Sequence, residues 1–233
     1  MPIRGPLIGP ALRLRIGASM LSAAGAVDTR PVKKRLVRFQ REHRRYFAAQ
    51  RKVIAIERRL RTARERLSRL DAAQDEAVET LARALVADGH RRRNPFAAFG
   101  APSPSRVARL PFADEVDVVH RLVAAVRRGG ALGERTSEAA RAADDAARAV
   151  GQAVIRVNEI EAQVRAARRT RDAVGRAWHS AYAGLKRGAR AAADDGAPEI
   201  HAILFPAASR ARSKRPLGVT APGNATGVKR IAD

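Results

Sequence analysis

Basic side chains recur every seven residues between positions 34 and 66. One series is Arg38, Arg45, Lys52, Arg59 and Arg66; a second is Arg44, Arg51 and Arg58, with Lys34 and Arg41 beside them. In a helix, a spacing of seven returns to the same side after about two turns, so these residues would form a basic stripe about 45 Å long. Most are arginine, whose planar guanidinium group matches the geometry of phosphate oxygens. The pattern predicts a polyanion-binding face.

The positive charge is concentrated near the start of the chain. Of 233 residues, 46 are Lys or Arg and 23 are Asp or Glu, which gives a formal net charge of +23. Residues 1–70 alone hold 19 basic and 4 acidic residues. Pairs such as Glu57 with Arg61 and Glu65 with Arg69 have the spacing of ion pairs within a helix. A solvated helix face is the simple alternative for the stripe, but the acids are too few to neutralise it.

The residues that usually carry enzymatic chemistry are absent or scattered. Without cysteine, thiolate catalysis, disulfides and cysteine zinc sites are excluded. The glycines after Arg128 lack the lysine of a phosphate-binding loop, and the acid pairs Asp144-Asp145 and Asp194-Asp195 suit solubility and helix ends. The histidines have no metal-binding spacing: they are His43, His90, His120, His179 and His201. We expect no catalytic residue, no metal and no cofactor, and therefore a protein that is not an enzyme.

Aromatic residues make up only 4% of the chain. Tyr46 falls on an apolar helix seam, and Trp178 and Tyr182 are expected to form a packed plug rather than a ligand site. No aromatic row follows the basic stripe, so stacking on nucleic-acid bases is not predicted. If nucleic acid binds, we expect contacts to phosphates without readout of the bases.

The basic stripe lies in a segment that has neither glycine nor proline from Val32 to Asp88. Such a segment can form one helix about 85 Å long, which we assign to residues 31–89. Its seam residues alternate in steps of four and three, the heptad pattern of a coiled coil, and the phase shifts near Ile56. They are Leu36, Phe39, His43, Tyr46, Gln50, Val53 and Leu60, and in the shifted phase Ile56, Leu60, Ala63, Leu67, Leu70, Gln74, Ala77 and Leu81.

A second heptad stretch predicts another long helix over residues 134–195. Moving the first seam forward by 104 residues superimposes it on the second, and several positions beside the seam also coincide. Examples are Ile56 with Ile160, Leu60 with Val164, Glu57 with Glu161 and Arg64 with Arg168. We interpret this agreement as an internal repeat, a tandem duplication, although a shared bias toward Ala and Arg is the alternative. The basic stripe is not repeated, because its counterpart positions in the second helix retain one base, Arg156.

The remaining segments are shorter. We expect a flexible basic and apolar arm over 1–30, a proline-rich loop over 90–110, a short helix over 111–130 and a short helical turn over 198–205. Acids near the start of the 111–130 helix and arginines at its end suit the helix dipole. Residues 206–233 are rich in Pro, Gly, Ser and basic residues without periodicity, which predicts a disordered basic tail.

These elements predict an all-α fold, in which two long helices form an antiparallel coiled-coil hairpin and the shorter helix packs against them. The connection of about 45 residues is long enough to return the chain. The alternative is that each long helix pairs with the same helix of another chain, as a homo-oligomer. The polar seam residues His43, Gln50, Gln74 and Arg171 would then specify register and partner.

Three functions remain open at this point. The first is a non-enzymatic scaffold or adaptor whose stripe docks on a polyanion, with nucleic acid or a nucleoprotein assembly favoured. The second is a coiled-coil protein that pairs with a partner helix or assembles structurally, with incidental charge. The third is peripheral attachment of the N-terminal arm to an anionic membrane. No apolar run is long enough for a transmembrane segment. A cytoplasmic or nucleoid-associated location is favoured, and an organellar matrix is possible if the source is eukaryotic.

Overall fold

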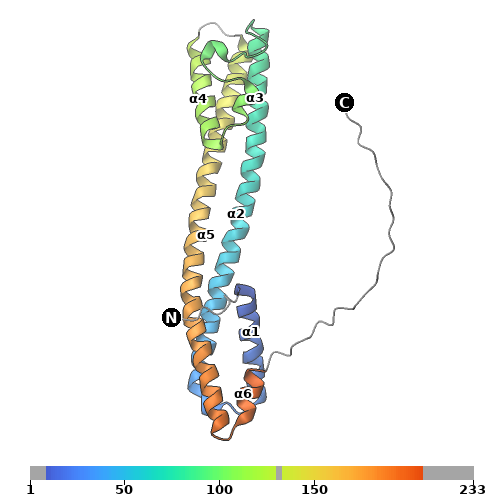
Figure 1. The fold of residues 1–233 in the computed structure, drawn as a ribbon. Coiled ribbons are helices and arrows are strands. Elements are labelled where there is room, and N and C mark those ends of the chain that lie inside the picture. Colours follow the sequence, from blue (N-terminus) through green and yellow to red (C-terminus); the bar gives the residue numbers. More distant parts are fainter. Residues whose placement is uncertain (1–8, 130–132, 207–233) are drawn as a thin grey trace, which may run out of the picture.

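Two long helices run side by side and form the body of the protein (Figure 1). The computed structural model describes residues 9–129 and 133–206. The long helices are α2, Lys33–Ala87, and α5, Glu134–Asp194. The shorter helices are α1, Pro10–Ala23; α3, Pro104–Val107; α4, Phe112–Arg128; and α6, Pro198–Leu204; single 3₁₀ turns occur at Ala24–Ala26, Arg30–Val32 and Ala97–Phe99. No β-strand occurs in the described ranges, so the all-α prediction is confirmed.

The two long helices are antiparallel. Contacts between them join increasing residue numbers on α2 to decreasing numbers on α5. In that order they are His43 with Trp178, Gln50 with Arg171, Glu57 with Arg168, and Arg64 with Glu161. The predicted helical hairpin is therefore confirmed, and the two seams face each other within one chain.

Each long helix ends at a glycine in the left-handed region of backbone space. Gly89 has a φ of 95° and Gly196 a φ of 99°, a conformation that glycine adopts without steric cost. Asp88 also fixes the start of α5, because its carboxylate accepts hydrogen bonds from the Gly133 amide and the Thr136 hydroxyl at 3.3 and 2.6 Å. A negative charge at a helix N-terminus is favourable. The end of α2 is thereby tied to the beginning of α5.

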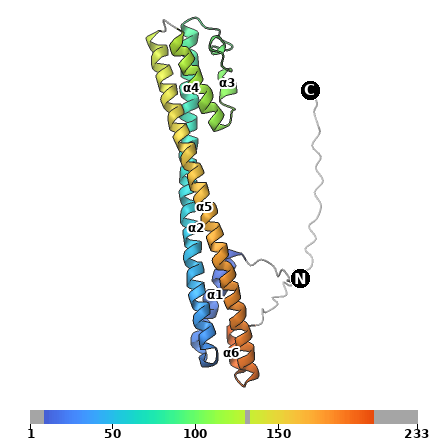
Figure 2. The ribbon, with the colours of Figure 1, turned by 90° about the vertical axis from the view of Figure 1, so that its left-hand side faces the viewer.

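The hairpin has a thick core at each end and a thin core between them. In the middle, around Val53, Ile56, Ile160 and Val164, only α2 and α5 contribute buried residues. At one end, α4 and the connection before it join the pair, and at the other end α1 and α6 do so (Figure 2). The predicted packing of the short helix against the hairpin is correct.

Residues 9–30 differ from the flexible arm expected for 1–30. Residues 10–23 form α1, in which Met20 is buried and Gly17 lies directly against His43. The guanidinium of Arg13 lies over the rings of Tyr46 and Trp178, at 5.3 and 5.7 Å from their centroids. These cation–π and apolar contacts hold the segment on the hairpin. Residues 1–8, 130–132 and 207–233, including nearly all of the predicted disordered tail, lie outside the described part.

Three of the four polar seam residues form contacts between the long helices. Trp178 Nε1 donates a hydrogen bond to Nδ1 of the buried His43 at 3.2 Å, and Arg171 donates to Gln50 at 3.5 Å. Burial lowers the pKa of His43, which favours the neutral ring with Nδ1 as an acceptor. The fourth polar seam residue, Gln74, is fully buried beside Glu115 of α4.

We expect Trp178→Ala to lower the free energy of unfolding by about 3–5 kcal/mol, because it removes a buried ring that packs on Phe39, Tyr46 and Tyr182. Urea unfolding followed by circular dichroism measures the change. Ile155→Ala, at a side chain that is 61% exposed, is the control and should change stability by less than about 0.5 kcal/mol. Equal effects of the two substitutions would contradict the described core.

We expect Glu115→Gln to stabilise the protein at neutral pH. Burial raises the pKa of Glu115; Gln74 opposes the rise, and Asp75 and Asp71 add to it. Because the folded state holds this proton to a higher pH than the unfolded chain, stability is lost as the pH rises through the folded pKa. Urea midpoints should favour the variant at about pH 7.5, and its advantage should shrink at about pH 4, below the ordinary glutamate pKa. A variant less stable at neutral pH would contradict this account.

Candidate polyanion-binding face

One side of the hairpin, which we call the covered face, carries α1, α4 and α6. On α5, four residues spaced by seven lie along this face: Glu161, Arg168, Gly175 and Tyr182. Gly175 lies against Arg13 of α1, and Tyr182 packs on Phe205 directly after α6. Phe112 of α4 lines a small depression together with Arg64 and Glu161. All three added helices therefore pack on the same side of the pair.

Charges on the covered face are paired between the two long helices. Arg168 donates to Glu57 at 2.5 Å, and Arg64 donates to Glu161 at 2.6 Å. The 104-residue shift relates Glu57 to Glu161 and Arg64 to Arg168, so it converts one ion pair into the other. A two-fold axis relates the contacts of a symmetric dimer in the same way. In these two ion pairs, residues that the 104-residue shift matches therefore occupy equivalent positions on the two long helices, and the duplication itself stays a prediction.

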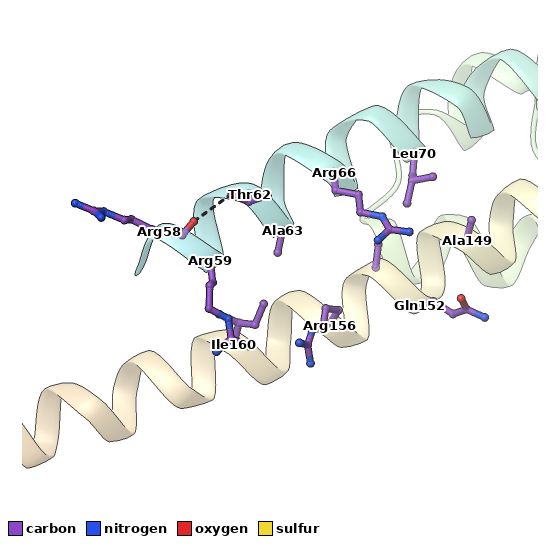
Figure 3. A pocket seen from close by; sticks show the side chains of 11 residues that line it. Arg58, Arg59, Thr62, Ala63, Arg66, Leu70, Ala149, Gln152, Arg156 and Ile160 are labelled. Carbon is purple, nitrogen blue, oxygen red and sulfur yellow. Dashed lines mark hydrogen bonds between the residues drawn. The ribbon is translucent and has the colours of Figure 1, made fainter. Parts of the chain in front are cut away.

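The opposite side, which we call the open face, carries a groove of about 680 Å³ near the middle of the hairpin (Figure 3). All residues that line it belong to α2 or α5. Its floor is apolar, and its rims carry arginines. The lining residues are Arg58, Arg59, Thr62, Ala63, Arg66, Leu70, Ala149, Gln152, Ala153, Arg156 and Ile160.

All ten residues of the predicted basic stripe are exposed. Arg59 and Arg66 line the groove, and Arg38, Arg45 and Lys52 continue their line along α2 at intervals of seven residues. We call these five residues the open-face row. Arg44, Arg51 and Arg58 lie about 100° further around the helix, on its outer side. Arg58 extends away from α5 in Figure 3, although it also borders the groove.

The stripe is not uniformly available to a partner. Arg41 and Arg45 each bind Glu42 at 3.1 Å, and this carboxylate residue is only 4% exposed. Arg51 lies over the exposed ring of Phe47. Within the described part of the chain, no carboxylate lies within ion-pair distance of the other members of the open-face row, which are Arg38, Lys52, Arg59 and Arg66.

The sequence pattern alone did not identify two features of this site. Glu42 lies outside the assigned seam, so its burial and its two arginine partners were not predicted. Arg156 was noted only as the remaining base of the second helix, yet it lines the groove opposite the α2 arginines and pairs with Glu159 at 2.8 Å. The 104-residue shift was the available signal, because it places Arg156 at the position equivalent to Lys52.

A separate charged cluster fastens α4 to α5. Asp144 is 7% exposed and binds Arg148, His120 and Arg127, so it does more than the solubility role expected from the sequence. Burial alone would raise the pKa of Asp144, but the hydrogen bonds from Arg148 and His120 outweigh it and lower that pKa. This cluster is structural and lies away from the groove.

Two further types of site can be assessed within the described residues. In residues 9–129 and 133–206, no group of three or more histidines and carboxylates is arranged to hold a metal ion. Among the helices in these ranges, none combines the length and the apolarity that crossing a membrane requires.

The open-face arginines and the Asp144 cluster should differ in their effect on stability. Asp144→Asn is expected to lower the free energy of unfolding by about 1–3 kcal/mol, since it weakens the contacts with Arg127, Arg148 and His120. The double variant Arg59→Gln, Arg66→Gln should change stability by less than about 0.5 kcal/mol, because neither arginine has a carboxylate partner in the described structure. Urea denaturation measures both. A large loss in the double variant would mean that these arginines have a structural role.

No protein-family model matches this chain, and no curated protein and no solved structure shows significant similarity to it.

Proposed function

We propose that the protein is a non-enzymatic helical scaffold or adaptor that docks on a polyanion through its open face, with nucleic acid or a nucleoprotein assembly as the partner. The observation that carries the proposal is the row of exposed bases beside a groove lined only by α2 and α5 in the described part of the chain. Because Arg38, Lys52, Arg59 and Arg66 have no carboxylate partner among the described residues, a phosphate partner would replace only water and counterions.

The composition of the groove favours contacts to the phosphate backbone. Guanidinium groups on its rims can each donate two hydrogen bonds to phosphate oxygens. The floor consists of Ala63, Leu70, Ala153 and Ile160 and offers no aromatic ring on which a base could stack. Binding through phosphates alone would be insensitive to base sequence.

The two other functions expected from the sequence have less support. Partner pairing through the seams would require the hairpin to open, because α2 and α5 already bury their seam residues against each other. Attachment of the N-terminal arm to a membrane would require α1 to release Met20 and Arg13 from the hairpin.

Reversal of three charges in the open-face row should abolish most polyanion binding. In the variant Lys52→Glu, Arg59→Glu, Arg66→Glu, we expect at least about a tenfold loss of affinity for DNA at moderate salt, because each lost phosphate contact also lowers the release of counterions. Fluorescence anisotropy over a salt series measures the affinity. For the wild type, the logarithm of the binding constant should fall linearly with the logarithm of salt concentration.

The matched control reverses three exposed arginines that are aligned on the outer side of α5, Arg169, Arg176 and Arg190. It changes the net charge by the same amount, so its loss should be several times smaller if the open face is the docking site. Equal losses in the two triple variants would indicate attraction by net charge alone. Unchanged DNA binding in the open-face variant would exclude this face.

A further inference from the structure

We propose that the open face accepts one single strand of nucleic acid, laid lengthwise along the groove between α2 and α5, in preference to a duplex. This inference rests on the proposed docking function and specifies its ligand. Three features of the open face support it: the straightness of its row of bases, the narrowness of the groove, and the contrast between floor and rims.

The open-face row is straight and spans about 42 Å from Arg38 to Arg66, at 1.5 Å per residue. A phosphate strand of a duplex winds around its axis and returns to the same side only once per turn, which is about 34 Å. A duplex lying along the row would therefore bring each strand to it only about once. A single strand can follow the row and meet every basic residue in turn.

The groove between two packed helices is narrow. The axes of two packed helices are about 8–10 Å apart. A DNA duplex is wider than this distance, since its major groove by itself is about 12 Å wide. A duplex could touch the rim of the groove but could not enter it. Arg59 and Arg66 on α2 and Arg156 on α5 stand on opposite rims, so a chain lying between them can be contacted from both sides (Figure 3).

The floor of the groove is apolar and its rims are positively charged. A single strand of nucleic acid likewise has a charged part, its phosphates, and less polar parts, its sugars and bases. Its phosphates suit the arginines, and its sugars and bases can lie against Ala63, Ala153 and Ile160 without specific hydrogen bonds. An inorganic polyphosphate chain would leave this apolar floor without a partner. The α5 side of the open face favours a ligand with one row of phosphates, because it has only one base at the positions equivalent to the open-face row. Those positions are Ala142, Ala149, Arg156, Gln163 and Thr170.

The test compares binding of three probes to the full chain by fluorescence anisotropy: a labelled 30-nucleotide oligo(dT), a duplex of the same length, and long-chain polyphosphate as competitor. We expect the single strand to bind at least about fivefold more tightly than the duplex at equal salt. If all five residues of the row and Arg156 contact phosphates, the salt slope should approach about −4, from 0.7 per contact for single strands.

The groove variant is Arg59→Gln, Arg66→Gln, Arg156→Gln, and the control is Arg169→Gln, Arg176→Gln, Arg190→Gln. Circular dichroism first verifies that both retain the wild-type helix content. The groove variant should lose at least about tenfold in affinity for oligo(dT) and reduce the slope by about 2, whereas the control should remain within about twofold. The duplex should lose less affinity than the single strand in the groove variant.

Each other outcome has a definite meaning. Duplex binding as tight as single-strand binding, or an equal loss for both in the groove variant, would overturn the single-strand inference and leave polyanion docking intact. Displacement of labelled oligo(dT) by polyphosphate at a lower phosphate concentration than by unlabelled oligo(dT) would overturn it in favour of a chain that has no bases. Absence of salt-dependent binding to any probe would overturn the proposed function as well.

Discussion

The close packing of α2 against α5 is the contact on which the other parts of the structure depend. Neither helix could bury its apolar residues alone, and in the middle of the hairpin no other segment among residues 9–129 and 133–206 covers them. Seam residues such as Ala63, Ala153 and Ala167 are small. Small residues let two helices approach closely, but they supply little buried area per residue. The larger side chains Phe39, Tyr46 and Trp178 at one end compensate for this thin middle.

The two faces of the hairpin differ because, as far as the structure describes the chain, further helices pack on only one of them. On the covered face, Glu57 with Arg168 and Arg64 with Glu161 neutralise each other beside the seam. On the open face, Arg38, Arg59 and Arg66 have no carboxylate partner among the described residues and remain in water, where an unpaired charge has little effect on folding. Folding therefore explains the pairing on the covered face but does not require the basic row on the open face. This difference is the physical reason for assigning the row to binding.

Periodicity and helix-breaking residues allow most of the fold to be predicted. The expected helices at 31–89 and 134–195 are observed at Lys33–Ala87 and Glu134–Asp194, because glycines end both of them. The packing of α1 could not be predicted in this way. It depends on Arg13 and Gly17 meeting Tyr46 and His43, which are distant in sequence and leave no periodic signal.

The candidate site shows the same division between local pattern and long-range contact. Exposure of the stripe follows from its spacing on α2, but the groove forms where α5 adds Arg156 and the apolar residues Ala153 and Ile160. The 104-residue shift relates the two rims, since equivalent positions of the two long helices meet on one face of an antiparallel pair. If the helices arose by duplication, a symmetric ancestor would have carried equal rims. The present chain keeps five bases in the open-face row of α2 and one at the equivalent positions of α5, so the two helices would contact a ligand unequally. A ligand with one row of charge matches such a face better than one with two equal rows.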